Sequence, residues 1–408
     1  MSKPSITPTV SGFTFEWTEE AIKIDASRLR SRDSRVEAEI VISNLKNGNK
    51  LLAPSHYNFT ARATIKKLET DMTAIFPSVS WLTILGQLTG YLVEKARTGE
   101  ETVEIDNEND VSPPGFLLYP LILDEIPTAI FGDKGSNKST MALVIAACLS
   151  LPWHDNQLGL IAPPKPKKVL LLDWEQEKRI VIWQTRCLAR GMELGTIPLF
   201  YRRCYVPLAD DIDQIKKHID ATAAEFLIID SLGPAAGGEL NRPDIALSFF
   251  NAYRSLKIPS LILAQNSKDQ ESKKKSIFGS TFFTYLSRSV WEIQKAQEPD
   301  SDDMDIALYH RESNYTKLFG TLAFHLTKSN ESITITKINP DSIDEFVQRL
   351  STNRKILVAL KAGRLSTQEL VEQLDVKRAT IDVALGRLKK VNKITGDSSG
   401  WGLLYECI

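Results

Sequence analysis

The pattern of apolar and polar positions changes twice along the 408 residues of the chain. Residues 1–110 alternate polar and apolar side chains in short stretches, which is typical of strands with one buried face. From residue 111 to about 340, continuous apolar runs alternate with helical segments, which is typical of a parallel sheet covered by helices on both faces. A polar connection over 341–352 leads to a compact unit over 353–408. We therefore expect an N-terminal α+β domain (1–110), a central α/β domain (111–340) and a C-terminal domain (353–408).

The strands of the central domain are expected to be buried on both faces, because their sequences are apolar throughout. We expect them over residues 126–131, 169–173, 226–230 and 260–264, with helices over 141–149, 177–190, 244–256 and 280–289, and later, antiparallel strands over 290–294, 306–310 and 333–337. Ligand sites of open α/β sheets lie outside the carboxyl ends of the parallel strands. Polar residues that follow these strands are therefore the first candidates for a functional site.

The two flanking domains differ in the order of their elements. In the first, we expect strands and then helices over residues 12–17, 21–25, 35–42, 60–68 and 81–96. In the last, we expect a helix, a short helix, a longer helix and a hairpin over residues 354–362, 370–374, 377–391 and 393–405. The segment Ser366–Glu369, just before the short helix, resembles a capping signature. This order predicts a winged helix-turn-helix.

Composition sets limits on these expectations. The apolar share is 42% and the charged share 25%, as in ordinary soluble proteins. A formal net charge of −1 means that the chain is not a polycation, so nucleic-acid binding would have to rest on local patches. The four cysteines lack the paired spacing of a disulfide frame or a zinc site, which indicates a reduced compartment. We find no secretory or membrane-spanning apolar stretch and expect a cytoplasmic protein.

The most specific motif lies between the first central strand and its helix. The sequence GDKGSNKST, residues 132–140, is close to the phosphate-binding pattern G-x-x-x-x-G-K-[ST]. In such a loop, backbone N–H groups and a helix N-terminus bind phosphate oxygens. The Lys138 ammonium adds charge for the β- and γ-phosphates, and the Ser139 hydroxyl ligates Mg²⁺. The predicted nucleotide-binding residues are Gly132, Gly135, Ser136, Asn137, Lys138, Ser139 and Thr140.

One position departs from this pattern, because Asn137 stands where the second glycine belongs. Asn is among the few non-glycine residues that readily adopt a positive φ. We therefore expect the loop to form despite the substitution.

Hydrolysis of ATP needs more than a phosphate loop, namely Mg²⁺, an oriented water and stabilisation of the charge on the γ-phosphate. Asp230 ends one apolar strand, where a carboxylate can hold the Mg²⁺ shell. Glu175 follows a second strand, where a carboxylate can orient the attacking water. Gln265 follows a third, where an amide can sense the γ-phosphate. All three are expected to converge with Lys138 at one edge of the sheet.

These motifs, in this order, resemble those of RecA-superfamily ATPases. The resemblance is nearest to the RepA-like helicase branch, often found in phages and other mobile elements; it covers about residues 118–326 and is carried by GDKGSNKST, VLLLDWE, FLIIDS, LILAQNSK and FGSTFFTYLSRSVW. It implies a RecA-like core in which Lys138 and Ser139 form the Walker A pair and Asp230 is the Walker B residue. Glu175 is then the catalytic base. Gln265 occupies the sensor position, where relatives often carry His.

The resemblance also implies a homo-oligomer, such as a hexameric ring. These folds usually cap each nucleotide with a basic residue of the neighbouring subunit, which stabilises the charge that develops on the γ-phosphate. Arg288, Arg311 and Lys317 are the candidates for this role. For each of them, an ordinary surface salt bridge is an equally good interpretation.

DNA is the partner that the resemblance implies. In RecA-like assemblies, the loops that correspond to residues 233–243 and 268–278 face the central axis and touch single-stranded DNA. The second loop carries three consecutive lysines that can neutralise phosphates, Lys273, Lys274 and Lys275, although a solvated lysine run is the alternative. Lys377 and Arg378 open the expected recognition helix of the C-terminal domain, which can contact a DNA duplex or serve protein interaction instead.

We therefore interpret the sequence as that of a Mg²⁺-dependent, oligomeric ATPase that acts on DNA as a helicase, loader or remodeller in the replication or maintenance of a phage or mobile element. Two alternatives remain. The first is an ATP-dependent DNA-binding regulator or defence component whose output is oligomerisation. The second is a nucleotide-binding scaffold without turnover. The fold cannot choose among them, because one fold supports many functions.

Overall fold

The structure, a computed structural model, describes residues 2–9, 11–32, 34–98, 102, 104, 113–266, 276–279, 281–343, 346, 352–397 and 399–404. It divides into two compact units. One comprises Met1–Ser112 with Val206–Ala221, and the other comprises Pro113–Tyr205 with Thr222–Ile408. Among the described residues, no helix has the length and the apolar character that crossing a membrane requires.

The first unit combines an antiparallel sheet with helices. Its five strands pair in chain order and are β1 (Ser5–Pro8), β2 (Phe13–Trp17), β3 (Ile22–Arg32), β4 (Arg35–Asn44) and β5 (Lys50–Asn58). Its helices are α1 (Arg62–Ile75), α2 (Trp81–Arg97) and most of α5 (Leu208–Thr222). Alternate residues of β4 are buried, as the sequence pattern predicted. Strands β1 and β5 escaped prediction because they lack such an alternation of buried and exposed residues.

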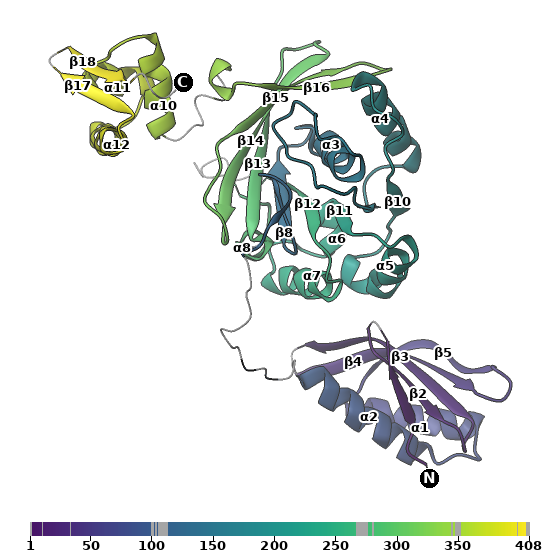
Figure 1. Ribbon diagram of the computed structural model, residues 1–408. Coiled ribbons are helices and arrows are strands. Elements are labelled where there is room, and N and C mark those ends of the chain that lie inside the picture. The colour runs from purple at the N-terminus through teal and green to yellow at the C-terminus, as the bar shows by residue number, and fades with distance from the viewer. Residues whose placement is uncertain are drawn as a thin grey trace. The chain divides into compact units, whose positions relative to one another are not determined.

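A nine-stranded sheet forms the centre of the second unit (Figure 1). Its strands lie side by side in the order β10, β9, β11, β12, β8, β13, β14, β15, β16. Their bounds are Pro127–Gly132 (β8), Val169–Asp173 (β9), Phe200–Arg203 (β10), Phe226–Asp230 (β11), Ser260–Gln265 (β12), Ser289–Ala296 (β13), Asp303–Ser313 (β14), Leu322–Lys328 (β15) and Ile333–Ile338 (β16). The predicted central strands and the mainly parallel sheet are therefore confirmed.

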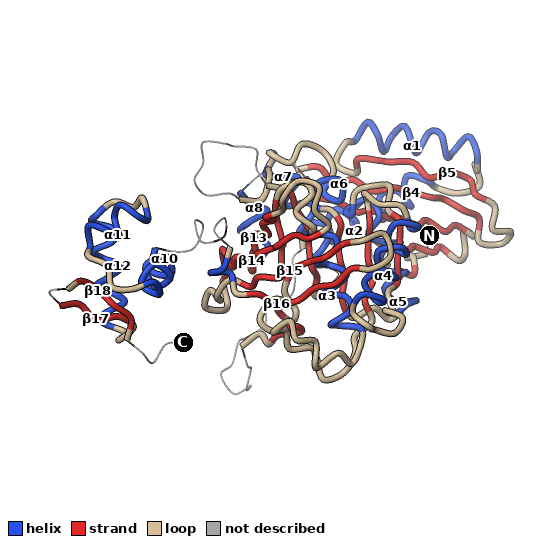
Figure 2. Tube along the Cα trace, turned by 90° about the horizontal axis from the view of Figure 1, so that it is seen from above, coloured by secondary structure: helices blue, strands red, loops and turns tan. Residues whose placement is uncertain are grey.

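Strand β13 differs from the expectation of an antiparallel strand. It pairs parallel with β8 on one side and antiparallel with β14 on the other. Helix α8 (Thr281–Ser287) lies between β12 and β13. Strands that run parallel in one sheet need a long connection of this kind. Figure 2 shows β14, β15 and β16 side by side beyond β13. Each of these strands pairs antiparallel with the one before it. The sheet thus has a parallel part and an antiparallel extension.

The central strands are apolar throughout because both of their faces are buried. Phe226 and Ile228 of β11 belong to the core cluster around helix α3 (Lys138–Ser150). Leu227 and Ile229, which alternate with them and point to the other face, are also fully buried. The continuous apolar run therefore reports burial on two sides.

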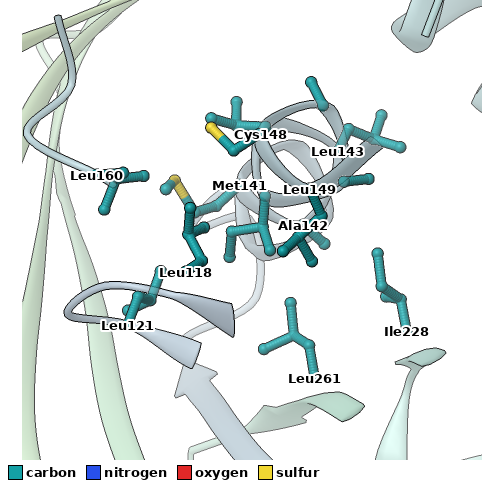
Figure 3. Packing of buried hydrophobic residues seen from close by; sticks show 14 of the residues in the cluster. Leu118, Leu121, Met141, Ala142, Leu143, Cys148, Leu149, Leu160, Ile228 and Leu261 are labelled. Carbon is teal, nitrogen blue, oxygen red and sulfur yellow. The ribbon is translucent and has the colours of Figure 1, made fainter. Parts of the chain in front are cut away.

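Helix α3 is apolar all round because it is enclosed on every side. All its residues from Thr140 to Ser150 are buried. Figure 3 shows Met141 and Leu149 of this helix among Leu118, Leu121 and Leu261 of neighbouring segments. The remaining elements of this part are β6 (Phe116–Leu118), β7 (Ile122–Leu123), α4 (Lys178–Gly191), α6 (Leu232–Ala236) and α7 (Pro243–Ser255).

The C-terminal segment has the predicted order of helix, short helix, longer helix and hairpin. After a short 3-10 turn, η1 (Pro340–Ser342), its elements are α10 (Thr352–Ala359), η2 (Leu360–Ala362), α11 (Thr367–Leu374), α12 (Arg378–Lys390), β17 (Ile394–Asp397) and β18 (Gly400–Leu403). Ser366 and Glu369 form a complete capping box at the start of α11, so that prediction is confirmed. The segment has its own core, which includes Leu370, Ile381 and Leu385. A winged helix-turn-helix remains a prediction.

Candidate nucleotide-binding site

Four adjacent parallel strands, β9, β11, β12 and β8, bring their carboxyl ends to one cavity. The cavity has a volume of about 260 Å³. Its lining includes residues 134–140 together with Glu175, Asp230, Gln265 and Lys328. The structure thus brings together the loop, both carboxylates and the amide that the sequence placed at one edge of the sheet.

The loop between β8 and α3 has the backbone of an anion-binding turn. Gly135 has a φ of 77°, and Asn137, the N-cap of α3, has a φ of 63° and a ψ of 29°. A Cβ atom added to Gly132 would lie 2.5 Å from the carbonyl oxygen of Ile293, so this close approach of β8 and β13 requires glycine. The first N–H groups of α3 have no acceptor within the helix and are available to an anion.

Lys138 is folded back over the start of the loop. Its Nζ donates hydrogen bonds to the carbonyl oxygens of Gly132 and Asp133, both at 2.9 Å. Burial lowers the pKa of the Lys138 ammonium, and the negative charges of Asp230, Glu175 and Asp133 oppose that shift. The ammonium is therefore held by neutral carbonyl groups close to the carboxylates, in a position from which it can turn to a phosphate.

Ser139 and Asp230 bring together two oxygen atoms of the kind that a hard cation prefers. The Ser139 hydroxyl donates a 2.7 Å hydrogen bond to Oδ2 of Asp230, which ends β11. Burial raises the pKa of Asp230 to about 6; Asp173 and Glu175 add to the shift, while Ser139 and Lys138 oppose it. A buried carboxylate next to a hydroxyl gains from a divalent cation, since Mg²⁺ takes oxygen ligands and offsets the cost of burying the charge.

Glu175 is held by a short turn after β9. The fully buried Asp173 accepts the N–H groups of Glu175 and Gln176 on its Oδ1, both at 2.8 Å. Ser231, the residue after Asp230, donates its hydroxyl to Oε1 of Glu175. The sequence showed Asp173 only as the acid that ends an apolar run, and its part in positioning Glu175 became visible only in the fold. Burial raises the pKa of Asp173, and the Arg203 guanidinium 3.5 Å away opposes that shift.

Gln265 ends β12 opposite Gly132 of β8 and lines the same cavity. Its backbone carbonyl accepts the N–H of Phe278 at 2.8 Å. The next residue, Asn266, donates its side-chain amide to Asp133 of the phosphate loop at 2.7 Å. The end of β12 is therefore tied both to the loop and to the segment that returns at residues 276–279.

Residues 95–271 match the family model of the AAA domain. This match, together with the loop and the carboxylates around it, supports a P-loop ATPase. Among solved structures, a KaiC-like protein from the hyperthermophilic archaeon Pyrococcus horikoshii is similar to the chain at 14% identity; the match covers 55% of this chain and 95% of that chain, with a TM-score of 0.36. No curated protein matches the chain.

The ATPase site contains one cationic residue that the sequence did not reveal, Lys328 at the end of β15. Its Nζ donates to Oγ1 of Thr140 at 3.1 Å and to Oδ1 of Asn137 at 3.3 Å. Burial lowers the pKa of the Lys328 ammonium. Local motifs could not have found it, because 188 residues separate it from Thr140.

The candidate residues for capping a neighbour's nucleotide lie outside the described lining of the ATPase cavity. Arg311 lies within β14, where its Nε and Nη2 are 2.8 Å and 2.6 Å from Oε2 of the buried Glu292. Arg288 follows α8 with a φ of 62°, and its carbonyl accepts the N–H of Asn314. Lys317 is exposed. For Arg311, reaching a neighbouring subunit would require giving up its bond to Glu292.

The candidate DNA-binding residues fall in two places. Lys273, Lys274 and Lys275 lie outside the described residues. Lys377 is the N-cap of α12 and Arg378 is the first residue of that helix, and both are exposed. Their side chains are thus available at a helix start.

Proposed function

We propose that the chain is a Mg²⁺-dependent, oligomeric ATPase of the RecA-like class, in the RepA-like branch, that acts on DNA for a phage or mobile element. The observation that carries the proposal is the contact between Ser139 and Asp230 in the same cavity as Lys138 and Glu175. The residues present fit ATP with Mg²⁺, because a phosphate loop, an ammonium and two kinds of oxygen ligand converge there.

Each residue has a separate task in this proposal. The N–H groups of the loop and Lys138 bind the phosphates, and Ser139 and Asp230 hold Mg²⁺, which when bound neutralises charge on the phosphates. Glu175 orients a water for in-line attack and takes its proton. Gln265, tied to the segment at 276–279 through its backbone, relays the state of the γ-phosphate to that segment.

The first test is ATP turnover by the full chain with Mg²⁺, in the presence and absence of single-stranded DNA. We expect turnover that single-stranded DNA stimulates and that Lys138→Ala removes, because the ammonium is needed for the β- and γ-phosphates. Wild-type turnover no faster than that of Lys138→Ala would contradict the ATPase proposal. Turnover without a DNA effect would contradict the DNA part alone.

A second expectation concerns assembly. Since Arg288, Arg311 and Lys317 lie outside the described cavity lining, we infer that a neighbouring subunit supplies the cation for the γ-phosphate. Light scattering with Mg²⁺ and a slowly hydrolysed ATP analogue should therefore give a mass that is a multiple of the 45.7 kDa protomer. A persistent monomer under conditions of full turnover would contradict this arrangement.

The exposed start of α12 favours a second candidate function, an ATP-dependent DNA-binding regulator. In that case Lys377 and Arg378 contact a duplex, as the N-terminal residues of recognition helices do. A sequence-specific duplex footprint that disappears in Lys377→Ala/Arg378→Ala, without strand separation by the wild type, would favour the regulator over a helicase.

A further inference from the structure

We propose that Lys328 is a second phosphate-binding cation of the nucleotide site, delivered by β15, positioned by Asn137 and directed to the phosphate nearest the nucleoside. The proposal rests on the proposed function, because it assigns a further residue to the same nucleotide site.

The position of Lys328 is defined by the first turn of α3. Asn137 is the N-cap of this helix and Thr140 is its third residue. The Lys328 ammonium donates to the side-chain oxygens of both, at 3.3 Å and 3.1 Å. It therefore lies against the helix end whose free N–H groups bind anions, and it lines the same cavity as Lys138.

The two ammonium groups sit at opposite ends of the phosphate loop. Lys138 is bound to the carbonyl groups of Gly132 and Asp133, where the loop leaves β8. Lys328 is bound where the loop enters α3. In phosphate loops the backbone cradles the α- and β-phosphates and the motif lysine reaches the β- and γ-phosphates. If Lys138 binds the β- and γ-phosphates, Lys328 at the start of α3 is in the position to bind the α-phosphate.

In its described hydrogen bonds, the Lys328 ammonium has only neutral partners. Both acceptors are uncharged oxygens, and none of the ion pairs between described residues includes Lys328. A partly buried ammonium without a counter-charge is costly, and the lowered pKa of Lys328 expresses that cost. An anion in the cavity would supply the missing negative charge. The arrangement is therefore that of a residue prepared for a ligand.

The contact with Lys328 gives a structural reason for asparagine, in place of glycine, at position 137. Its Oδ1 accepts from Lys328, while its Nδ2 donates to the sulfur of Met304 at 2.8 Å. The two bonds fix the carboxamide between β14 and β15, and a glycine at this position could form neither. Asn137 thus combines a left-handed backbone with an acceptor that aims Lys328.

The experiment measures the affinity of the full chain for Mg²⁺-ATP and Mg²⁺-ADP by calorimetry. Lys328→Gln removes the charge and keeps most of the length, and we expect it to weaken both nucleotides by a similar factor, about 10-fold to 100-fold, the range of a lost charged hydrogen bond. Lys328→Arg should recover most of the affinity. Lys138→Ala should weaken ATP more than ADP. Asn137→Gly should weaken both nucleotides less than Lys328→Gln does.

The control is Lys295→Ala, which removes an exposed lysine side chain of β13 whose one described hydrogen bond is to Gln297. It should leave both affinities unchanged.

The melting temperature of ligand-free Lys328→Gln should equal or exceed that of the wild type, since an uncompensated charge is removed. A clear decrease would indicate a structural lysine and overturn the proposal. Wild-type affinities in Lys328→Gln would also overturn it, if Lys138→Ala still loses ATP. Failure of the wild type itself to bind ATP would instead refute the proposed function.

Discussion

Replacing Glu175 with glutamine is expected to lower ATP turnover by about 10²-fold to 10⁴-fold, the usual contribution of a general base. The substitution keeps the shape of the side chain, its backbone bond to Asp173 and an oxygen that can accept from Ser231. It removes only the ability to take a proton from the attacking water. Phosphate release at saturating Mg²⁺-ATP measures the effect.

The interpretation of this result depends on binding. Glu175→Gln should bind Mg²⁺-ATP about as well as the wild type, because phosphate affinity depends on the loop and Lys138. Loss of both binding and turnover would mean that Glu175 supports the loop. Turnover close to wild type would show that another group orients the water. Glu177→Gln, which changes the exposed N-cap of α4 two residues away, is the matched control.

Replacing Asp230 with asparagine is expected to separate stability from function. Burial raises the pKa of this carboxyl from 3.8 to about 6, which corresponds to about 3 kcal/mol against the ionised form in the folded state. At pH 7 the ligand-free variant should therefore unfold at a higher temperature than the wild type. It should also lose the stabilisation that Mg²⁺-ATP gives, because the Mg²⁺ ligand is gone.

The difference in stability between Asp230→Asn and the wild type should depend on pH. Between about pH 6 and pH 4 the folded wild type takes up the proton on Asp230 while the unfolded chain does not, so this group makes the wild type more stable as the pH falls. The advantage of Asp230→Asn should therefore shrink between pH 7 and pH 4. Asp155→Asn, at an exposed position in the same unit, should show no such change. An advantage that is constant with pH would rule out the buried charge as its cause.

The central strands were predictable because burial on two faces leaves a direct trace in the sequence. A strand such as β11 has no polar position before Asp230, and few other structures produce that pattern. The ends of such strands in a parallel sheet must meet at one edge, so the neighbourhood of Lys138, Glu175 and Asp230 could be inferred from the order of the motifs alone. The left-handed backbone of Asn137 could be anticipated for a similar reason, since few residue types tolerate it.

Residues whose roles depend on pairing between distant strands could not be inferred in this way. Lys328 ends a strand in an ordinary alternating pattern, and nothing local distinguishes it from an exposed lysine. Its place beside Thr140 follows from the way the strands pair: β13 pairs with β8, β14 with β13, and β15 with β14. The parallel and antiparallel pairing of β13 could not be inferred either, because it also depends on strands distant in the sequence. Periodicity gives the face of a strand, but its neighbours follow from the whole sheet.

The bond between Asn137 and Lys328 also constrains how the two positions can change over evolutionary time. Alanine at position 137 would have to adopt the left-handed conformation at a cost of about 1–2 kcal/mol, so glycine, asparagine and aspartate are the favoured residues there. The Oδ1 of asparagine is one of the two described acceptors of the Lys328 ammonium, and a glycine at position 137 would leave that ammonium only the Thr140 hydroxyl. Among homologous chains, we therefore expect these two sites, 191 residues apart, to covary: asparagine with lysine, and glycine with an uncharged residue.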